Sequence, residues 1–478
     1  MIAAATAARR GLRVIVFEKA PCVGGTTGMS VGTIMAARTR QQRAAGIVDH
    51  PNTHAADLEA ICRSMGVTDD AQLRQVLVEN VADTVAWLRE IGINFLAPLP
   101  QPPHSVDRLH QVMPTSRAYV VRLHRMCMKL GVVFHLGMPA TRLIVEQSRV
   151  VGIEAGISDA TVLARARAGV ILASGDAGGN GRLMHAYMKT WADGVEIYNP
   201  NNSGDGHEMA LAAGADIVAR KDLGFESTAH IRFVKPKRNA FQNIPPYPAL
   251  TRMMVLAAKY LPKRMIRPIL MRFLTTVLGP DAGVFKEGAL LVNKQGARIG
   301  DEHGLPNILI PREPDGVGYL VFDHRFACKF SKWPYFISTA PGVAFAYIQD
   351  YKSTRPDLFT RSQTLTELAE KRGFDAEQLM ASVELANRSR SEATRLLEGP
   401  FYALGPVKTW VLVAPLGLRV TNHFEVLHRD GGVIPGLFAV GHVGMGGFTM
   451  TGHGHGLGWA FTSGRLAAEY AADQIDVP

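Results

Sequence analysis

The hydrophobic pattern of the chain begins with a short apolar run at residues 14–17. Four residues are too few for a helix, so this run predicts a buried parallel strand. Apolar residues recur at three- and four-residue spacing in residues 71–77 and 81–88, which predicts helices. Further segments predict helices at residues 2–10 and 118–130, strands at 132–136 and 170–173, and a hairpin at 140–144 and 150–155.

A glycine-rich segment follows the strand at residues 14–17, after Glu18 and Lys19. A carboxylate at the carboxyl end of the second strand of a dinucleotide-binding unit can accept both hydroxyls of an adenosine ribose. Glycines let the backbone approach a ligand closely, and hydroxyls can bond phosphate or a ring edge. Besides Glu18 and Lys19, the candidate ligand contacts are Gly24, Gly25, Thr26, Thr27, Ser30 and Gly32. The pattern also fits any Rossmann-like second strand with a glycine-rich turn.

Similar combinations of a strand, glycines and a helix recur later in the chain. Residues 170–180 form a second strand followed by a glycine-rich loop, and residues 199–207 open a helix that runs through Ala215. Ser203 or Asp205 could instead serve only as a helix cap. Near the C-terminus, residues 434–441 form a final strand with its loop, and glycines at 454, 456 and 458 open the last helix.

In their order and spacing, these segments resemble the superfamily of fumarate reductase/succinate dehydrogenase flavoproteins and 3-ketosteroid dehydrogenases, which are FAD-dependent oxidoreductases. The resemblance runs from residue 2 to 472 and is weakest in the middle. It implies an α/β fold, with a Rossmann-like FAD-binding domain and an inserted α+β substrate-capping domain. We therefore expect the FAD domain at residues 1–217 and 415–478 and the cap at 218–414.

The resemblance also implies the residues that contact FAD. Beyond those of the first loop, they are Ala140, Ala173, Ser174, Gly175, Asp205, Gly441, His442, Gly456 and Leu457. The backbone of Ala140 is expected near the adenine. His442 stands where the family usually has Glu, Asp or Asn to hold the ribitol, so that contact departs from the pattern.

The family's first strand and Gly-x-Gly-x-x-Gly loop precede the helix that is predicted here at residues 2–10. We expect either a truncated version of a complete flavoprotein, which we favour, or a variant with impaired FAD binding. A chain used as given would then bind FAD weakly, because the phosphate loop normally places the pyrophosphate at a helix N-terminus.

The chemistry implied by the resemblance is hydride transfer between flavin and a carbon next to a carbonyl. The dicarboxylate-binding members of the family have a carboxylate clamp, which residues 413–418 and 449–456 of this chain lack, and His303 replaces the family's proton-donating arginine. We therefore expect dehydrogenation or reduction of a carbon–carbon bond in an apolar ketone or steroid-like substrate, rather than fumarate or succinate. The alternatives are a flavin-fold protein with weakened FAD binding and no catalysis, or an amine-oxidising flavoenzyme.

Six residues are candidates for the catalytic groups. Gly454 matches the family's carbonyl-polarising backbone N–H, whereas Met450 stands where a tyrosine is expected. His453 or His455 could then supply the missing donor, since histidine suits proton transfer near neutral pH. Alternatively, both are loop histidines that bind water. Tyr119 is a candidate base, as are Tyr335 and Tyr347.

Composition narrows the choice of partners. The net charge is +10, but aromatic–basic interleaving and metal-ligand spacing are absent, so we expect no nucleic acid and no metal. The four scattered cysteines fit a reducing, cytoplasmic location. Residues 251–275 carry cations among apolar residues and no acid; they predict either a pair of cap helices or an amphipathic helix on an anionic membrane. The expected partners are a small apolar substrate and an electron acceptor that the sequence does not identify.

One further segment concerns the cap. Residues 290–302 are expected to form a strand, a turn and a second strand. We expect Arg298 and Glu302 to hold the cap together rather than to take part in chemistry.

Overall fold

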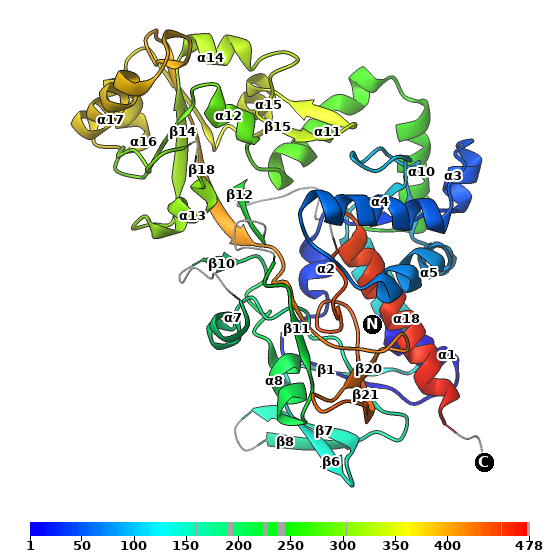
Figure 1. Ribbon diagram of the computed structural model, residues 1–478. Coiled ribbons are helices and arrows are strands. Elements are labelled where there is room, and N and C mark those ends of the chain that lie inside the picture. Colours follow the sequence, from blue (N-terminus) through cyan, green and yellow to red (C-terminus); the bar gives the residue numbers. More distant parts are fainter. Residues whose placement is uncertain are drawn as a thin grey trace.

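The chain folds into two lobes that are joined by extended segments (Figure 1). The computed structural model describes residues 1–157, 160–188, 195–222, 228–236, 244–302, 304–450 and 452–475. The terminal lobe contains both chain termini, and the inserted lobe is formed by the middle of the chain. His303, named above for the missing proton donor, lies outside the described residues.

The terminal lobe is built from the first half and the last sixty or so residues of the chain. Its first elements are α1 (Ile2–Arg9), β1 (Ile15–Glu18), α2 (Gly25–Met29), β2 (Thr33–Met35), α3 (Arg40–Ala44), α4 (Pro51–Ser64), α5 (Ala71–Glu90), β3 (Asn94–Phe95), β4 (Leu109–Met113), α6 (Arg117–Lys129) and β5 (Val133–Leu136). They are followed by β6 (Ala140–Glu146), β7 (Arg149–Ile157), β8 (Ala160–Arg165), β9 (Val170–Leu172), α7 (Gly181–Tyr187), β10 (Glu196–Ile197), α8 (Asp205–Ala212) and β11 (Ile217–Ala219). The chain returns to this lobe with β19 (Leu416–Leu418), β20 (Glu425–Leu427), β21 (Val433–Ala439) and α18 (His455–Asp473).

Two short parallel pairings organise the terminal lobe. β1 pairs with β5 from Ile15 opposite Val133 to Glu18 opposite Leu136, and β21 pairs with β9. β6, β7 and β8 form an antiparallel meander, which confirms the predicted hairpin and extends it by one strand. The apolar face of α18 packs on α1 and α5, and Trp459 is fully buried there. The mixed arrangement confirms the predicted α/β fold class.

The inserted lobe is built around an antiparallel sheet. Its elements are β12 (Ala229–Phe233), α10 (Pro248–Tyr260), α11 (Lys263–Val277), α12 (Ala282–Lys286), β13 (Leu290–Val292), α13 (Pro306–Leu309), η2 (Ile310–Arg312), β14 (Gly318–Phe322), α14 (His324–Lys329), β15 (Ser338–Ala340), β16 (Ala344–Ala346), α15 (Ile348–Thr354), β17 (Phe359–Ser362), α16 (Leu365–Arg372), α17 (Ala376–Ser389), η3 (Glu392–Thr394) and β18 (Phe401–Val411). β18 is the long central strand and pairs with β10, β12, β14 and β17. Because β10 belongs to the first half of the chain, the sheet continues across the boundary between the lobes.

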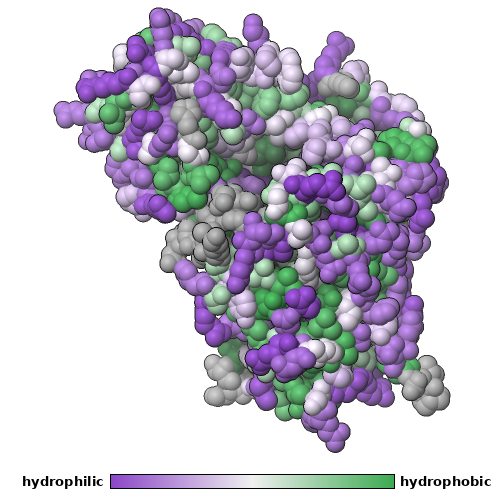
Figure 2. Space-filling view, in the orientation of Figure 1, coloured by the Kyte–Doolittle hydropathy of each residue, from purple (hydrophilic) through white to green (hydrophobic). Residues whose placement is uncertain are grey.

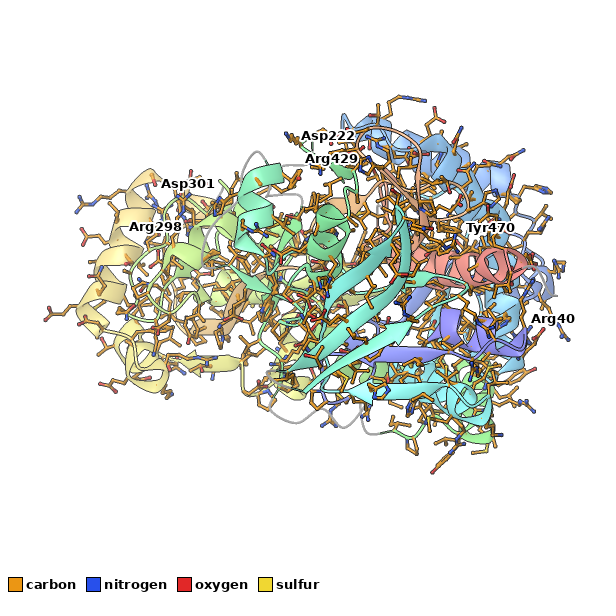
Figure 3. All side chains as sticks on the ribbon, turned by 90° about the horizontal axis from the view of Figure 1, so that it is seen from below. Arg40, Asp222, Arg298, Asp301, Arg429 and Tyr470 are labelled. Atoms are coloured by element: carbon orange, nitrogen blue, oxygen red, sulfur yellow. The ribbon has the colours of Figure 1, made fainter. Side chains whose placement is uncertain are left out.

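The segment 290–302 forms less regular structure than its pattern predicts. β13 is present, but the second strand is reduced to a single bridge between Val292 and Arg298. Glu302 is buried and accepts a hydrogen bond from Nε of Arg298 at 3.0 Å, and its other oxygen accepts one from buried Arg390. Figure 3 shows Arg298 and Asp301 at the far end of the inserted lobe, well away from Arg40 and Tyr470 in the terminal lobe. Their position fits a purely structural role.

No helix among the described residues is both long enough and apolar enough to cross a membrane.

We predict that Glu302→Ala destabilises the inserted lobe by about 3–5 kcal/mol, because it leaves the buried Arg390 cation without its carboxylate. Urea unfolding followed by intrinsic fluorescence measures the loss. The matched control is Glu384→Ala on α17, whose ion pair with Arg388 is exposed; it should cost no more than about 1 kcal/mol. Equal losses in the two variants would contradict the structural role of Glu302.

Candidate active site

The predicted ribose-binding carboxylate lies at the carboxyl end of β1. The Oε1 atom of Glu18 accepts a hydrogen bond from the backbone N–H of Ala20 at 2.9 Å, which fixes the side chain. No other hydrogen bond to the Glu18 side chain occurs within the part of the chain that the structure describes, so its second carboxylate oxygen is available to a ligand hydroxyl. The neighbouring Lys19 instead donates to Asp205 at 2.7 Å and to Ser203. Lys19 and Asp205, both predicted to bind the cofactor, thus form an ion pair at the start of α8.

The glycines of the first loop shape a short helix. Gly24 and Gly25 have φ angles of 136° and 47°, which side-chain-bearing residues rarely adopt. A Cβ atom added to Gly25 would have one neighbour within 4 Å, the Nδ2 atom of Asn199 at 3.9 Å, so the space above the N-terminus of α2 is open. Thr27 and Ser30 end this helix, and the Ser30 hydroxyl donates to the Thr27 carbonyl.

A polar junction joins three predicted loops. The hydroxyl oxygen of Thr26 accepts hydrogen bonds from the side-chain amides of Asn199 at 2.9 Å and Asn202 at 3.2 Å. Asn202 also donates to the carboxylate of buried Asp176 at 2.5 Å. Burial raises the pKa of Asp176 to about 6. The sequence interpretation missed Asp176, Asn199 and Asn202 as individual residues, although it identified the loops that carry them.

The second loop packs closely against this junction. Gly175 has a φ angle of 85°, and an added Cβ atom would lie 2.8 Å from the side-chain oxygen of Asn202. Ala173 and Ser174 directly follow β9, and Ser174 packs so tightly on α8 that a Cβ atom on Gly206 would lie 2.3 Å from its hydroxyl. Ala140 begins β6, one strand of the meander. The predicted loop residues are therefore brought together, with Ala140 on the adjoining sheet.

Tyr119 is part of the core. Its side chain is fully buried between Phe95 and Phe461, and its hydroxyl donates to the Gly32 carbonyl at 2.9 Å. Burial raises its pKa well above 10. Gly32 is equally enclosed, because an added Cβ atom would lie 2.5 Å from Val112. This geometry gives Tyr119 and the α-carbon of Gly32 packing roles, and we assign Tyr119 no part in proton transfer.

The N-terminus of α18 meets a partly buried histidine. Gly454 has a φ angle of 92°, and a Cβ atom there would lie 2.8 Å from the backbone nitrogen of Met35. A Cβ atom on Gly456 would touch the ring of His442 at 3.4 Å, so this ring lies against the first turn of the helix. Burial lowers the pKa of His442 to about 4, which leaves it neutral near pH 7. A neutral imidazole beside a helix N-terminus can bond a hydroxyl or a ring edge.

The remaining predicted cofactor residues of this region have contacts inside the protein. The N–H of Gly441 donates to the Ser463 hydroxyl, and its carbonyl accepts from the indole of Trp459. The Leu457 side chain packs partly buried against the core of the terminal lobe. The backbone groups of Gly456 and Leu457 belong to the first turn of α18, where N–H groups lack partners within the helix.

The two candidate histidines of this segment point to different places. His455 is fully buried, and its Nε2 atom lies 3.0 Å from Nε2 of His54 on α4. The ring of His104 lies 5.3 Å from that of His455, and Arg108 with Asp49 and Asp57 surrounds the group with ion pairs. His453, in contrast, is exposed to solvent. Burial and the nearby Arg232 cation lower its pKa.

His453 interacts electrostatically with two residues of the inserted lobe that the sequence interpretation missed. These are His230 and Arg232, which share one face of β12 because successive strand residues alternate between faces. The pKa of His230 is lowered to about 4. Burial is the largest cause, and electrostatic interactions with Arg232 and His453 lower it further. The alternating His-x-Arg pattern on a strand was the available signal.

A tyrosine connects this group to the first loop. The guanidinium of Arg232 lies 5.7 Å from the centre of the Tyr198 ring, and the Lys235 ammonium lies 3.9 Å from it. The Tyr198 hydroxyl donates to the carbonyl of Met29, the last residue of α2. The site therefore combines cations of the inserted lobe with the loop predicted to hold the flavin.

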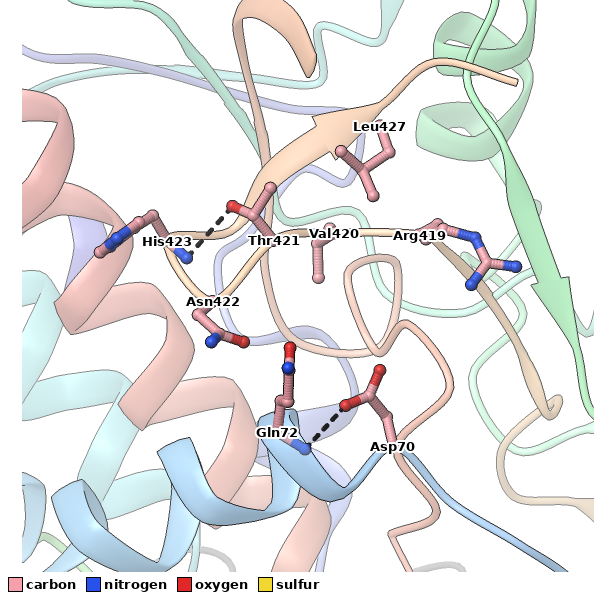
Figure 4. A pocket seen from close by; sticks show the side chains of 8 residues that line it. All are labelled: Asp70, Gln72, Arg419, Val420, Thr421, Asn422, His423 and Leu427. Carbon is pink, nitrogen blue, oxygen red and sulfur yellow. Dashed lines mark hydrogen bonds between the residues drawn. The ribbon is translucent and has the colours of Figure 1, made fainter. Parts of the chain in front are cut away.

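A hollow of about 430 Å³ on the terminal lobe lies elsewhere (Figure 4). It is bounded by Asp70, Gln72 and the segment 419–423, and Asp70 is occupied in capping α5. None of the predicted site residues lines it, so we assign it no role in catalysis.

The residues present fit both the adenosine end and the flavin end of FAD. Glu18 offers a carboxylate oxygen for the adenosine ribose, and the open space at Gly25 admits a ligand close to the backbone. Neutral His442 and the N-terminus of α18, whose first turn holds no acidic residue, suit the ribityl chain and the flavin pyrimidine edge. These polar groups and the open space at Gly25 agree with FAD as the predicted cofactor.

Comparison with known proteins points to the same cofactor. Residues 1–240 and 275–458 match a family described as "FAD binding domain". The chain is 26% identical to NADH:acrylate oxidoreductase of Vibrio harveyi over 84% of its own length, but it spans only 37% of that relative. It is 23% identical to 3-oxosteroid 1-dehydrogenase of Mycolicibacterium smegmatis, covering 98% of the chain and 94% of the relative. The fold matches the open conformation of a flavocytochrome c3 fumarate reductase with a TM-score of 0.71 and 22% identity, over 99% of this chain and 76% of that one.

We predict that Glu18→Gln weakens FAD binding by about 10- to 100-fold, since a charged acceptor for ribose hydroxyls becomes neutral while the bond to Ala20 is kept. Quenching of flavin fluorescence on titration into flavin-free protein measures the affinity. Glu384→Gln, on the exposed face of α17, is the matched control and should bind as the unaltered protein does. Unchanged affinity of Glu18→Gln would remove the proposed ribose contact.

The buried histidines predict loss of stability in acid. Burial lowers the folded-state pKa of His54 well below 6.5 and that of His104 to about 4. Their neutral forms therefore stabilise the fold above about pH 6.5, and this stabilisation is lost as pH falls towards about 4. For His104 alone, the loss reaches about 3 kcal/mol at most.

We expect His54→Met to make the decline of unfolding free energy between about pH 7 and pH 5 shallower, because a buried proton-binding group is removed. Urea unfolding at the two pH values gives the slope. His423→Met removes an exposed histidine that stacks on Tyr470 and should leave the slope unchanged. If His54→Met shows the unaltered slope, then His54 does not contribute to acid sensitivity.

Proposed function

Because the chain belongs to the FAD binding domain family, we propose that it is an FAD-dependent oxidoreductase that acts on a carbon–carbon bond next to a carbonyl. We further propose an apolar ketone or steroid-like substrate rather than fumarate or succinate. The observation that supports the activity is the group of Arg232, His230 and His453, which Tyr198 connects to the C-terminus of α2 at Met29. Bound FAD supplies hydride transfer, and the protein supplies position, charge and proton handling.

Arg232 is the natural partner of the substrate carbonyl oxygen. Negative charge grows on that oxygen when the neighbouring carbon loses a proton or gains a hydride. A partly buried guanidinium, placed over Tyr198 and next to His453, stabilises this charge more strongly than a solvent-exposed cation does. The hydrogen bond from Tyr198 to Met29 holds the cation beside the flavin loop.

The two histidines suit the proton transfer. Their lowered pKa values keep both imidazoles neutral near pH 7, so each can accept a proton from carbon in dehydrogenation or pass one on in reduction. His453 is open to solvent, which provides a route for proton exchange with water.

An aromatic group of the inserted lobe supports the proposal of an apolar substrate. Trp333, Phe336 and Phe345 of the inserted lobe pack together, with ring centres 4.7 Å apart between Trp333 and Phe345 and 5.0 Å apart between Phe336 and Phe345. Gly342 lies in the turn between β15 and β16, and an added Cβ atom there would lie 2.8 Å from Pro100 of the terminal lobe. Hydrophobic residues also appear in the recess between the lobes in the space-filling view (Figure 2). An apolar ring system matches these surroundings.

A second candidate substrate class is a small unsaturated carboxylate. The cationic groups of Arg232 and Lys235 both lie over the Tyr198 ring. Two neighbouring cations can bind one carboxylate. The similarity to an acrylate oxidoreductase favours the same class.

Substrate panels separate these candidates. The FAD-loaded protein is assayed with cyclic enones and ketosteroids, using a dye as electron acceptor or a reduced viologen as donor, and with acrylate and fumarate under the same conditions. Turnover of the ketones supports the main proposal, and turnover restricted to carboxylates supports the second. Turnover restricted to amines, or none in a protein that binds FAD and is reduced by dithionite, contradicts both.

We predict that Arg232→Gln lowers kcat by about 10²- to 10³-fold on the active substrate, because it removes the fixed charge facing the developing oxyanion. Flavin absorbance should show unchanged FAD content. Arg388→Gln, an exposed arginine on α17, is the matched control and should keep full activity. A change confined to KM would assign Arg232 to substrate binding alone.

A further inference from the structure

Two helices of the inserted lobe carry large apolar side chains on their outer surface. α10 and α11 follow each other through Leu261 and Pro262 and lie at the upper right of Figure 1. We call the segment Pro248–Val277 the basic hairpin. Its strongly exposed apolar residues are Met253, Leu256, Tyr260, Leu261, Met265 and Ile269, among which Met253 is 62% and Tyr260 71% exposed.

The exposed apolar residues follow helical spacing. Met253, Leu256 and Tyr260 are three and four residues apart on α10, and Met265 and Ile269 are four apart on α11. Thr251 of α10 and Met271 and Leu274 of α11 are buried. Each helix therefore has a buried anchoring side, while a second, apolar side faces solvent. A soluble surface helix normally turns a polar side outward.

The charge of the hairpin is entirely positive. Six cations and no carboxylate occur between residues 244 and 280. Arg267 pairs with Asp350 of α15. Within the described residues, no carboxylate lies within ion-pair distance of Arg252, Lys259, Arg264 or Arg272. These four positions are exposed and stand among the exposed apolar residues. The outer surface therefore offers apolar insertion and unpaired positive charge together.

The hairpin lies directly outside the candidate active site. Asn94 of β3 donates to the Thr251 hydroxyl at 2.8 Å, which ties α10 to the terminal lobe. α11 packs on β12, the strand that carries His230 and Arg232, and on β15 and β16. The exposed Trp333 belongs to the same aromatic group as Phe345 of β16. A surface that binds the hairpin therefore also lies close to the site.

We infer that the basic hairpin docks on an anionic lipid bilayer. The apolar side chains enter the boundary between headgroups and acyl chains, and the unpaired cations contact lipid phosphates. Tyr260 and Trp333 suit the interfacial layer, where amphipathic aromatic rings collect. The combination favours a bilayer over an acidic protein, because charge complementarity alone would not require six exposed large apolar residues. The inference does not depend on the identity of the substrate.

Vesicle sedimentation tests the inference with the full chain loaded with FAD. The probes are vesicles of phosphatidylcholine alone and vesicles in which about a third of the lipid is phosphatidylglycerol. We expect binding to the anionic vesicles, at least about tenfold weaker binding to the neutral ones, and release at high salt. Equal binding to both, or none to the anionic vesicles, overturns the inference.

Variants locate the binding surface. Arg252→Glu combined with Leu256→Glu should weaken binding to the anionic vesicles at least about tenfold. Arg388→Glu combined with Leu385→Glu makes the same changes on exposed positions of α17 and should leave binding intact. Equal loss in both double variants overturns the assignment to the hairpin.

Two further measurements separate other outcomes. Flavin absorbance and the unfolding midpoint show whether each variant is folded, and turnover of a water-soluble substrate shows whether the site is intact. A folded, active variant that no longer binds vesicles supports docking independently of the proposed function. Should light scattering show that the unaltered protein is an oligomer and that the hairpin variant is a monomer, without any lipid binding by either, the face is an interface between copies and docking on lipid is wrong.

Discussion

The hydrogen bonds of Thr26 with Asn199 and Asn202 are the constraint on which the site depends. They join loops that are far apart in the chain, and Asn202 extends the connection to buried Asp176. A buried polar group without a partner is costly, so each member of this junction holds the others in place. Because the junction surrounds the start of α2, it sets the position of the helix whose last carbonyl receives the Tyr198 hydroxyl. The guanidinium of Arg232 lies over the Tyr198 ring, so the junction also lies near this cation.

The same chain of contacts explains why the site forms between the lobes. The terminal lobe contributes the flavin loops and His453, whereas the inserted lobe contributes His230 and Arg232 on a strand of its central sheet. β18 pairs with both β10 and β12, so the sheet itself spans the boundary. A shared strand limits how far the two halves of the site can separate. The lobes are therefore connected through the backbone at the place where the chemistry is proposed.

The sequence predicted the elements and loops better than the individual contacts. Short apolar runs and glycine-rich turns are local signals, so β1, the β6–β7 hairpin and α18 could be placed from residue order alone. Tyr119 shows the limit, because nothing local distinguishes a catalytic tyrosine from one whose hydroxyl bonds a buried carbonyl. His453 and His455 are two residues apart, yet one reaches the surface and the other meets His54, about 400 residues away in the chain. His230 and Arg232 required knowledge of which strand faces the flavin loop, and that depends on the pairing of β12 with β18.

Burial divides the ionisable residues of the site into two classes. Partial desolvation lowers the pKa values of His230, His442 and His453, so all three are neutral near pH 7. An arginine keeps its charge even when burial lowers its pKa, so Arg232 remains a cation in the same surroundings. Chemistry next to a carbonyl needs two kinds of group. One is a permanent cation that stabilises negative charge on the carbonyl oxygen, and the other is a neutral imidazole that can accept a proton. Among the residues that the structure describes, no ion pair joins Arg232 to a carboxylate, and its guanidinium lies over the ring of Tyr198.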